Sequence, residues 1–280
     1  MHVLKLRPAD QSTAVTFLGL DPIAGGLIHS LILRRGWHGR TEYWGLWDCR
    51  GDGNGLAGLV SRDDRGRGTL CGGGPPWIEP VGALLRSWLD ADPAHLGYFD
   101  APAEMAGGLA RAAPPVTSTD LAILACERDN ALGPATQRGR PHGLAIREAA
   151  QGDAPALTAL YQDEAGFAWV DVPGTLAMCR DGHRLWLVGT KGDQIVTAGW
   201  GNTLEPGAAR LSGIMTRLDQ RGRGYAATIT AELTRRLAGQ GRTPYLYVAA
   251  DDPAANALYD RLGYRLHSRR VGLSYGGEPR

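Results

Sequence analysis

The chain has 280 residues and a formal net charge of +1, from 30 lysines and arginines against 29 aspartates and glutamates. This length exceeds one typical domain, and the balanced charge argues against a protein that binds nucleic acid through an excess of basic side chains. The four cysteines form no CxxC or Cys/His cluster and no apolar run reaches about 18 residues, so we expect a cytoplasmic protein with reduced thiols, no metal site and no membrane segment.

Residues 1–130 are predicted to form a first domain of mixed α/β structure. Strands are expected at 43–47, 56–60, 96–99 and 121–125, and helices at 23–33 and 81–89. The run Gly72-Gly73-Gly74 is either a vestigial anion-binding loop or, as we favour, a solvated connection. Trp37, Trp44 and Trp47 either line an acceptor cleft or, again as we favour, pack in the core.

Residues 131–143 are predicted to be a linker, and residues 144–280 a second domain of α/β structure with a mixed sheet. Its strands are expected at 144–147, 185–188, 195–200, 209–214 and 245–248. Its helices are expected after a cap at Asp153, at 175–180, at 226–236 and from Ala254. A strand at 271–275 is expected to close this second sheet.

The clearest chemical signal is a basic, glycine-rich turn between a strand and a helix, Arg221-Gly222-Arg223-Gly224-Tyr225-Ala226. Glycines permit close approach of a ligand, and the first turn of the next helix has unpaired N–H groups at its positive end. The turn is not a Walker A loop, which needs Lys and Ser/Thr after its second glycine. A Rossmann turn is formally matched by Gly222-x-Gly224-x-x-Ala227, but that turn should follow its strand directly.

A third interpretation comes from a resemblance. The turn resembles the Arg/Gln-x-x-Gly-x-Gly/Ala signature of the GNAT (GCN5-related N-acetyltransferase) superfamily. Downstream, Asp252-Pro253-Ala254-Ala255-Asn256-Ala257-Leu258-Tyr259-Asp260-Arg261-Leu262-Gly263-Tyr264 resembles the second GNAT signature in the form of its FR47-like branch. Asp252 departs from the Asn that relatives commonly carry. The resemblance implies a GNAT fold in the C-terminal half, and the order of elements implies a degenerate GNAT-like repeat, without the turn, in the N-terminal half.

The resemblance also implies a site for acetyl-CoA as the acyl donor. The pantetheine arm would pair with the backbone of Ile214, Met215 and Thr216, and the amides from Gly222 through Arg223, Gly224 and Tyr225 to Ala226 would hold the pyrophosphate. Arg221 and Arg223 would add charge, and Asn256 would bond the pantetheine arm. Tyr259 would be the general acid that protonates the departing sulfur.

No motif identifies the general base that would deprotonate the amine. Glu164 and Asp171 lie in the segment that overhangs the acceptor in this fold, so both are candidates, although for each residue taken alone we favour a solvated loop residue. We expect an acyl-CoA-dependent N-acetyltransferase whose acceptor is a small-molecule amine, with no nucleic acid or membrane partner and a possible homodimer. An aminoacyl-tRNA-dependent transferase with two GNAT repeats and a noncatalytic acyl-CoA-binding module are the alternatives.

Overall fold

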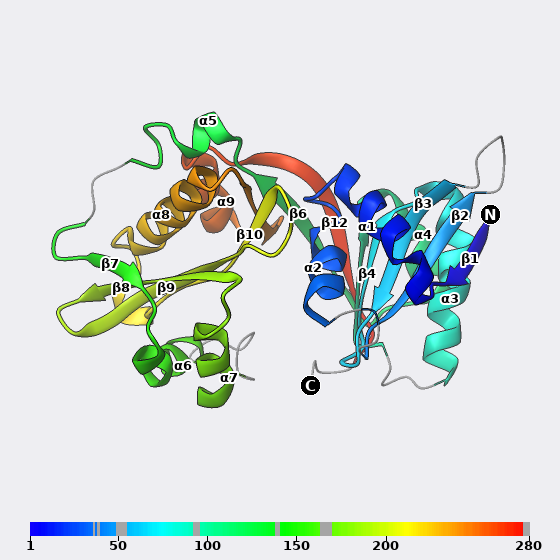
Figure 1. Ribbon diagram of the computed structural model, residues 1–280, viewed down its shortest axis with the longest axis horizontal. Helices are drawn as coiled ribbons and strands as arrows, with labels where there is room; N and C mark the ends of the chain where they lie inside the picture. Colours follow the sequence, from blue (N-terminus) through cyan, green and yellow to red (C-terminus); the bar gives the residue numbers. More distant parts are fainter. Residues whose placement is uncertain are drawn as a thin grey trace. The chain divides into compact units, whose positions relative to one another are not determined.

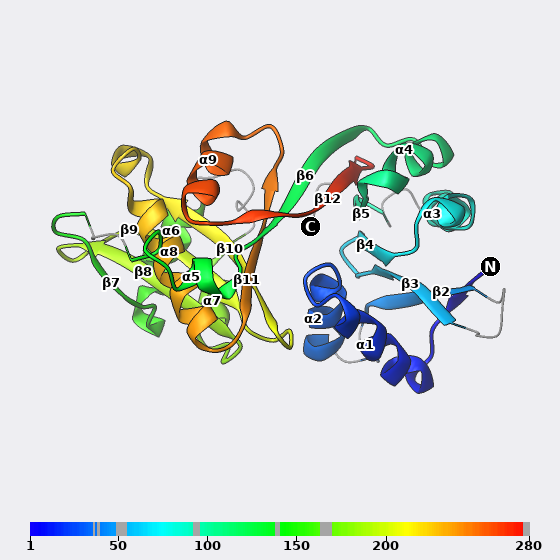
Figure 2. The same ribbon diagram turned by 90° about the horizontal axis from the view of Figure 1, so that it is seen from above.

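A computed structural model describes residues 1–35, 37, 40–48, 55–91, 96–137, 141–162 and 170–276. The chain forms two compact units. The N-terminal unit comprises Met1–Ile123, Ala249–Asp251 and the residues from His267 onward. The C-terminal unit comprises Leu124–Val248 and Asp252–Leu266. The strands belong to one mixed 12-stranded sheet, of which each unit holds a part with helices on both faces (Figure 1, Figure 2), and this confirms the predicted α/β fold class.

The sheet of the N-terminal unit has the strand order β1-β2-β3-β4-β5-β12. Its strands are β1 (His2–Lys5), β2 (Glu42–Asp48), β3 (Gly55–Arg62), β4 (Arg67–Gly72), β5 (Tyr98–Pro102) and β12 (Arg265–Ser274). The neighbours are antiparallel except β4 and β5, which are parallel. Helices α1 (Gln11–Leu20) and α2 (Gly26–Arg35) cover one face, and α3 (Ile78–Ala91) and α4 (Ala103–Ala112) cover the other (Figure 2).

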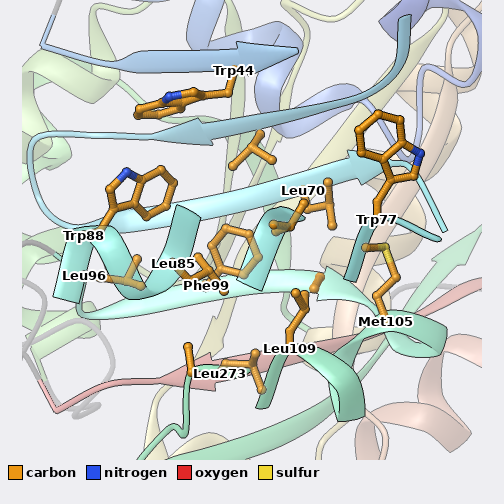
Figure 3. Packing of buried hydrophobic residues seen from close by; sticks show 14 of the residues in the cluster. Trp44, Leu70, Trp77, Leu85, Trp88, Leu96, Phe99, Met105, Leu109 and Leu273 are labelled. Atoms are coloured by element: carbon orange, nitrogen blue, oxygen red, sulfur yellow. The ribbon is translucent and has the colours of Figure 1, made fainter. Parts of the chain in front are cut away.

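The two faces of this sheet hold separate hydrophobic cores, because successive strand residues point to opposite sides. On β4, Leu70 packs under α3 and α4, whereas Cys71 packs under α1 and α2. Figure 3 shows the first core, in which the rings of Trp44 and Trp88 lie 4.8 Å apart. Trp37 and Trp44 are each 8% exposed, which confirms that these two tryptophans are core residues.

The sheet of the C-terminal unit has the strand order β11-β10-β9-β8-β7. Its strands are β7 (Ala145–Glu148), β8 (Arg184–Lys191), β9 (Gln194–Asn202), β10 (Ala208–Thr216) and β11 (Thr243–Ala249). Helix α8 (Tyr225–Gly239) lies on one face, and α6 (Ala154–Gln162) and α7 (Val172–Cys179) lie on the other (Figure 1). Helix α9 (Pro253–Arg261) follows β11, and α5 (Arg128–Ala131) packs on α8.

Strands β6 (Thr117–Ala125) and β12 each pass from one unit to the other. Strand β6 begins in the N-terminal unit and ends in the C-terminal unit. Strand β12 begins in the C-terminal unit and ends in the N-terminal unit. The expectation that 271–275 closes the second sheet is wrong, because Val271 pairs with Ala101 of β5 in the N-terminal unit. Figure 3 shows the consequence for packing, since Leu273 of β12 lies in the core of that unit. The predicted domains, 1–130 and 144–280, are each one continuous segment of chain. In the structure, each unit is instead built from two or more separate segments.

Candidate active site

The C-terminal unit contains an opening between two parallel strands. Strands β10 and β11 pair only through Ala208–Arg210 against Thr243–Tyr245. Strand β10 then continues to Thr216 and β11 to Ala249 without further pairing to each other. The edge of β10 beyond Arg210 therefore offers backbone groups to a ligand that enters between the strands.

A β-bulge interrupts β10 at this opening. The pairing with β9 shifts between Ser212 and Met215, so that Gly213 and Ile214 have no partner in β9. Gly213 has φ +60°, and a Cβ there would lie 1.9 Å from the ring of Trp200, so only glycine fits. The hydroxyl of Tyr161 donates to the carbonyl of Gly213 at 2.7 Å and fixes the bulge. The sequence analysis missed this feature, although a glycine inside a strand pattern signals a bulge.

The predicted glycine-rich turn follows β10 and leads into α8. Gly222 and Gly224 have φ +77° and +78°, a conformation that favours glycine, and Gly224 is the N-cap of α8. A Cβ at Gly222 would meet nothing within 4 Å, and a Cβ at Gly224 would meet only Pro141, at 4.0 Å. The turn therefore presents open backbone, next to the first N–H groups of α8.

A cavity of 370 Å³ lies at this turn, and we call it the turn cavity. Six of the predicted site residues line it: Thr216, Arg221, Gly222, Gly224, Tyr225 and Ala226. The sequence analysis missed the wall that α9 contributes through Ala254, Leu258 and Arg261. Three other predicted residues, Ile214, Met215 and Arg223, do not line the turn cavity. The side chain of Met215 packs in the core on the α6 face, and Arg223 is exposed. The strand opening and the turn cavity together fit an extended ligand with an anionic group.

Helix α9 carries the predicted general acid. The ring of Tyr259 packs against Tyr264 at 5.8 Å, and its hydroxyl forms no hydrogen bond with any residue that the structure describes. Burial, with a smaller contribution from Asp252, raises the pKa of this phenol above its ordinary value of 10. The group therefore stays protonated at neutral pH and retains a proton to donate.

The other predicted residues of α9 and α7 have helix-terminal contacts. The carboxylate of Asp252 caps α9 by accepting from the N–H of Ala255 at 2.9 Å, and the amide of Asn256 donates to the carbonyl of Asp252 at 2.6 Å. Asp171 caps α7 by accepting from the N–H of Gly174 at 2.7 Å. Glu164 lies outside the described residues. The roles proposed for Asn256, Asp171 and Glu164 stay predictions.

Comparison with known proteins places this geometry in a family. The sequence profile of FR47-like proteins matches residues 190–271, which include β9, the bulge, the turn and α9. Residues 190–271 form a GNAT domain of the FR47-like type. No curated protein matches the sequence. The predicted recognition of this branch is confirmed.

Solved structures match the whole chain. A GCN5-related N-acetyltransferase from Sphaerobacter thermophilus is 17% identical and covers 100% of this chain and 97% of its own, with a TM-score of 0.69. A tandem GNAT protein from the clavulanic acid biosynthesis pathway is 12% identical and covers 99% of both chains, with a TM-score of 0.62. At these identities the matches establish the fold, and they confirm a second GNAT-like unit in the N-terminal half.

The GNAT-like N-terminal unit has a corresponding strand opening, but a side chain fills it. Strands β4 and β5 pair only through Arg67–Thr69 against Tyr98–Asp100. Just past this point, the Arg270 guanidinium donates to the carbonyl of Leu70 at 2.7 Å and to the Asp100 carboxylate at 2.7 and 2.9 Å. A cavity of 500 Å³, lined by Gly72 and Gly73 among others, adjoins this guanidinium. The backbone acceptor of β4 is therefore already occupied.

The described part of the chain has neither a metal-ligand cluster nor a membrane-spanning helix. Its His, Cys, Asp and Glu side chains form no group of three or more that could hold a metal ion. None of its helices is both long enough and apolar enough to span a membrane. Among the cysteines within this part, Cys71, Cys126 and Cys179 are free thiols.

Proposed function

We propose that the GNAT domain transfers an acetyl group from acetyl-CoA to the primary amine of a small molecule. The observation that carries the proposal is the strand opening beyond Arg210, which leads to a turn cavity whose two glycines leave the backbone uncovered. An opening whose strand edge has no neighbouring strand beyond Arg210 suits the amides of a pantetheine arm. Backbone N–H groups at a helix N-terminus suit a diphosphate.

Different residues of the site would carry out different steps of the transfer. The backbone of Ile214 to Thr216 would orient the thioester along β10, and the N–H groups of the bulge would stabilise negative charge on its carbonyl oxygen. The amine nitrogen attacks the carbonyl carbon, a C–N bond forms and the C–S bond breaks. The hydroxyl of Tyr259 would give its proton to the departing sulfur, and a carboxylate, Glu164 or Asp171, would take the proton of the amine.

The small-molecule acceptor is proposed from the charge of the chain. A net charge of +1 lacks the basic excess that a tRNA-bound substrate would favour. A panel of primary amines, assayed for thiol release from acetyl-CoA, tests this point. Transfer only from aminoacyl-tRNA would support the first alternative, and tight acetyl-CoA binding without thiol release for any amine would support a noncatalytic binding module.

The donor site is tested by Gly224→Val with Gly192→Val as a matched control. Both glycines have positive φ, so each valine costs about 1–2 kcal/mol of backbone strain, but only Gly224 lines the turn cavity. Calorimetry should show acetyl-CoA binding abolished by Gly224→Val and preserved by Gly192→Val. Arg221→Ala should weaken binding less than Gly224→Val. Equal acetyl-CoA affinity in the two valine variants would refute the site.

A further inference from the structure

Tyr161 lies on α6 and is fully buried in the core of the C-terminal unit. Its ring packs against the rings of Trp186 and Trp200, with centroids 5.9 and 5.5 Å away. The two tryptophan rings also lie 5.3 Å from each other. These three rings, from α6, β8 and β9, form one packed group that we call the aromatic cluster. The cluster leaves the ring of Tyr161 little freedom to turn.

The hydroxyl of Tyr161 replaces a bond that the bulge removes from the sheet. Carbonyl groups of a regular strand are paired with the neighbouring strands. Gly213 lies in the bulge, without a partner in β9, and beyond the pairing with β11. Its carbonyl accepts from the Tyr161 hydroxyl at 2.7 Å instead. Burial raises the pKa of this phenol far above its ordinary value of 10, so the hydroxyl keeps its proton and remains a donor.

The same bond sets the direction of the next N–H along the chain. The carbonyl of Gly213 and the N–H of Ile214 belong to one trans peptide unit, in which the two groups point in opposite directions. The N–H of Ile214 therefore points away from Tyr161. A Cβ at Gly199 would lie 2.5 Å from Cδ1 of Ile214 and 3.2 Å from Leu233 of α8, so the Ile214 side chain packs on the α8 face. The peptide unit is thus held from both faces of the sheet.

We propose that Tyr161 is a positioning residue for acyl transfer, which acts by aiming the N–H of Ile214 at the thioester carbonyl. The inference rests on the proposed function. As the amine attacks, the carbonyl oxygen gains negative charge, and a donor already fixed in place stabilises that charge more than it stabilises the ground state. Ile214 pairs with neither β9 nor β11, so neither neighbouring strand competes for its N–H. Tyr161 acts through the peptide unit and not by contact with the substrate.

Tyr161→Phe tests the proposal, because it keeps the ring in the aromatic cluster and removes only the hydroxyl. Removing an oxyanion donor altogether costs about 10²–10³ in kcat, so loosening the support of one should cost about tenfold. The affinity for acetyl-CoA, measured by calorimetry, should stay within about twofold, since the loss falls on the transition state.

Tyr275→Phe is the matched control. The hydroxyl of Tyr275 also donates to a backbone carbonyl, that of Ala113 at 3.1 Å, but in the N-terminal unit. The control variant should change neither kcat nor acetyl-CoA affinity, and thermal melting checks that both variants are folded. An unchanged kcat in folded Tyr161→Phe, or an equal loss in the two variants, would overturn the positioning role.

A second measurement uses the unmodified protein, labelled with ¹⁵N-isoleucine. The amide resonance of Ile214 is identified by its absence in Ile214→Val. Acetyl-CoA should shift this amide proton downfield relative to CoA, which has no thioester carbonyl, and Tyr161→Phe should reduce the difference. The same Ile214 resonance with both bound ligands would overturn the positioning role and leave the donor site in place. If the unmodified protein binds neither ligand, the proposed function itself fails, and the inference fails with it.

Discussion

Replacing Arg270 by methionine should strongly destabilise the N-terminal unit. The side chains of Arg270 and Asp100 are each 4% exposed, and the guanidinium also donates to the carbonyl of Leu70. Without it, the Asp100 carboxylate stays buried and keeps, among the contacts described here, only the hydroxyl of Thr69, at 3.1 Å. Removing one partner of a buried ion pair costs about 3–5 kcal/mol. We expect Arg270→Met to lower the free energy of unfolding by that amount.

A matched control lies on the same strand. Arg265 is the first residue of β12 and forms an ion pair with Asp260, but the side chains of Arg265 and Asp260 are 64% and 74% exposed. Exposed ion pairs contribute about 1 kcal/mol or less, so Arg265→Met should have a small effect. Urea denaturation followed by tryptophan fluorescence reports on both units, because the core of the N-terminal unit holds Trp44, Trp77 and Trp88 and that of the C-terminal unit holds Trp186 and Trp200, so the two methionine variants are compared by the same signal. Equal destabilisation by the two methionine variants would refute the reasoning.

The double variant Arg270→Met, Asp100→Leu separates the buried charge from simple loss of packing. Because it removes the unpaired carboxylate, it should recover more than half of the stability lost in Arg270→Met. No recovery would mean that the arginine acts through packing and its bond to Leu70 rather than through the ion pair.

Three further outcomes are expected. Tyr259→Phe should lower kcat about 10²-fold with little change in the KM for acetyl-CoA. The melting temperature should change little, since the hydroxyl has no described hydrogen-bond partner. A lower melting temperature with normal kcat would show that Tyr259 is structural. Calorimetric titration should give one acetyl-CoA per chain, because Arg270 occupies the strand opening of the N-terminal unit, and a stoichiometry of two would contradict this. Burial raises the pKa of the Cys71 thiol to about 11, so a thiol reagent at pH 8 should label it in the unfolded but not the folded protein, as mass spectrometry would show.

Much of the candidate site could be predicted from the sequence, because the signals that mark it are local. A run of apolar residues, two glycines and a following helical pattern lie within one short stretch, so the turn and the start of α8 were predicted to within one residue. In the N-terminal half the signals are weaker, and the predictions omitted β1, α1, β4 and α4. Strand β4 has glycines at 68 and 72, and α4 contains Gly108, where a Cβ would lie 2.5 Å from Ile78. Close packing, not helix propensity, selects that glycine.

Only the tertiary structure decided which residues distant in the sequence meet. Arg270 and Asp100 are 170 positions apart, and the local sequence of β12 does not name the strand that it pairs with. A strand pattern specifies which side chains are buried but not the neighbour that accepts the backbone hydrogen bonds, since every strand edge offers the same groups. The partner of β12 follows from the burial of Leu273 and the Arg270–Asp100 pair. Likewise, glycine is required at position 213 because the ring of Trp200 leaves no room for a Cβ. That contact exists only after β9 and β10 have paired.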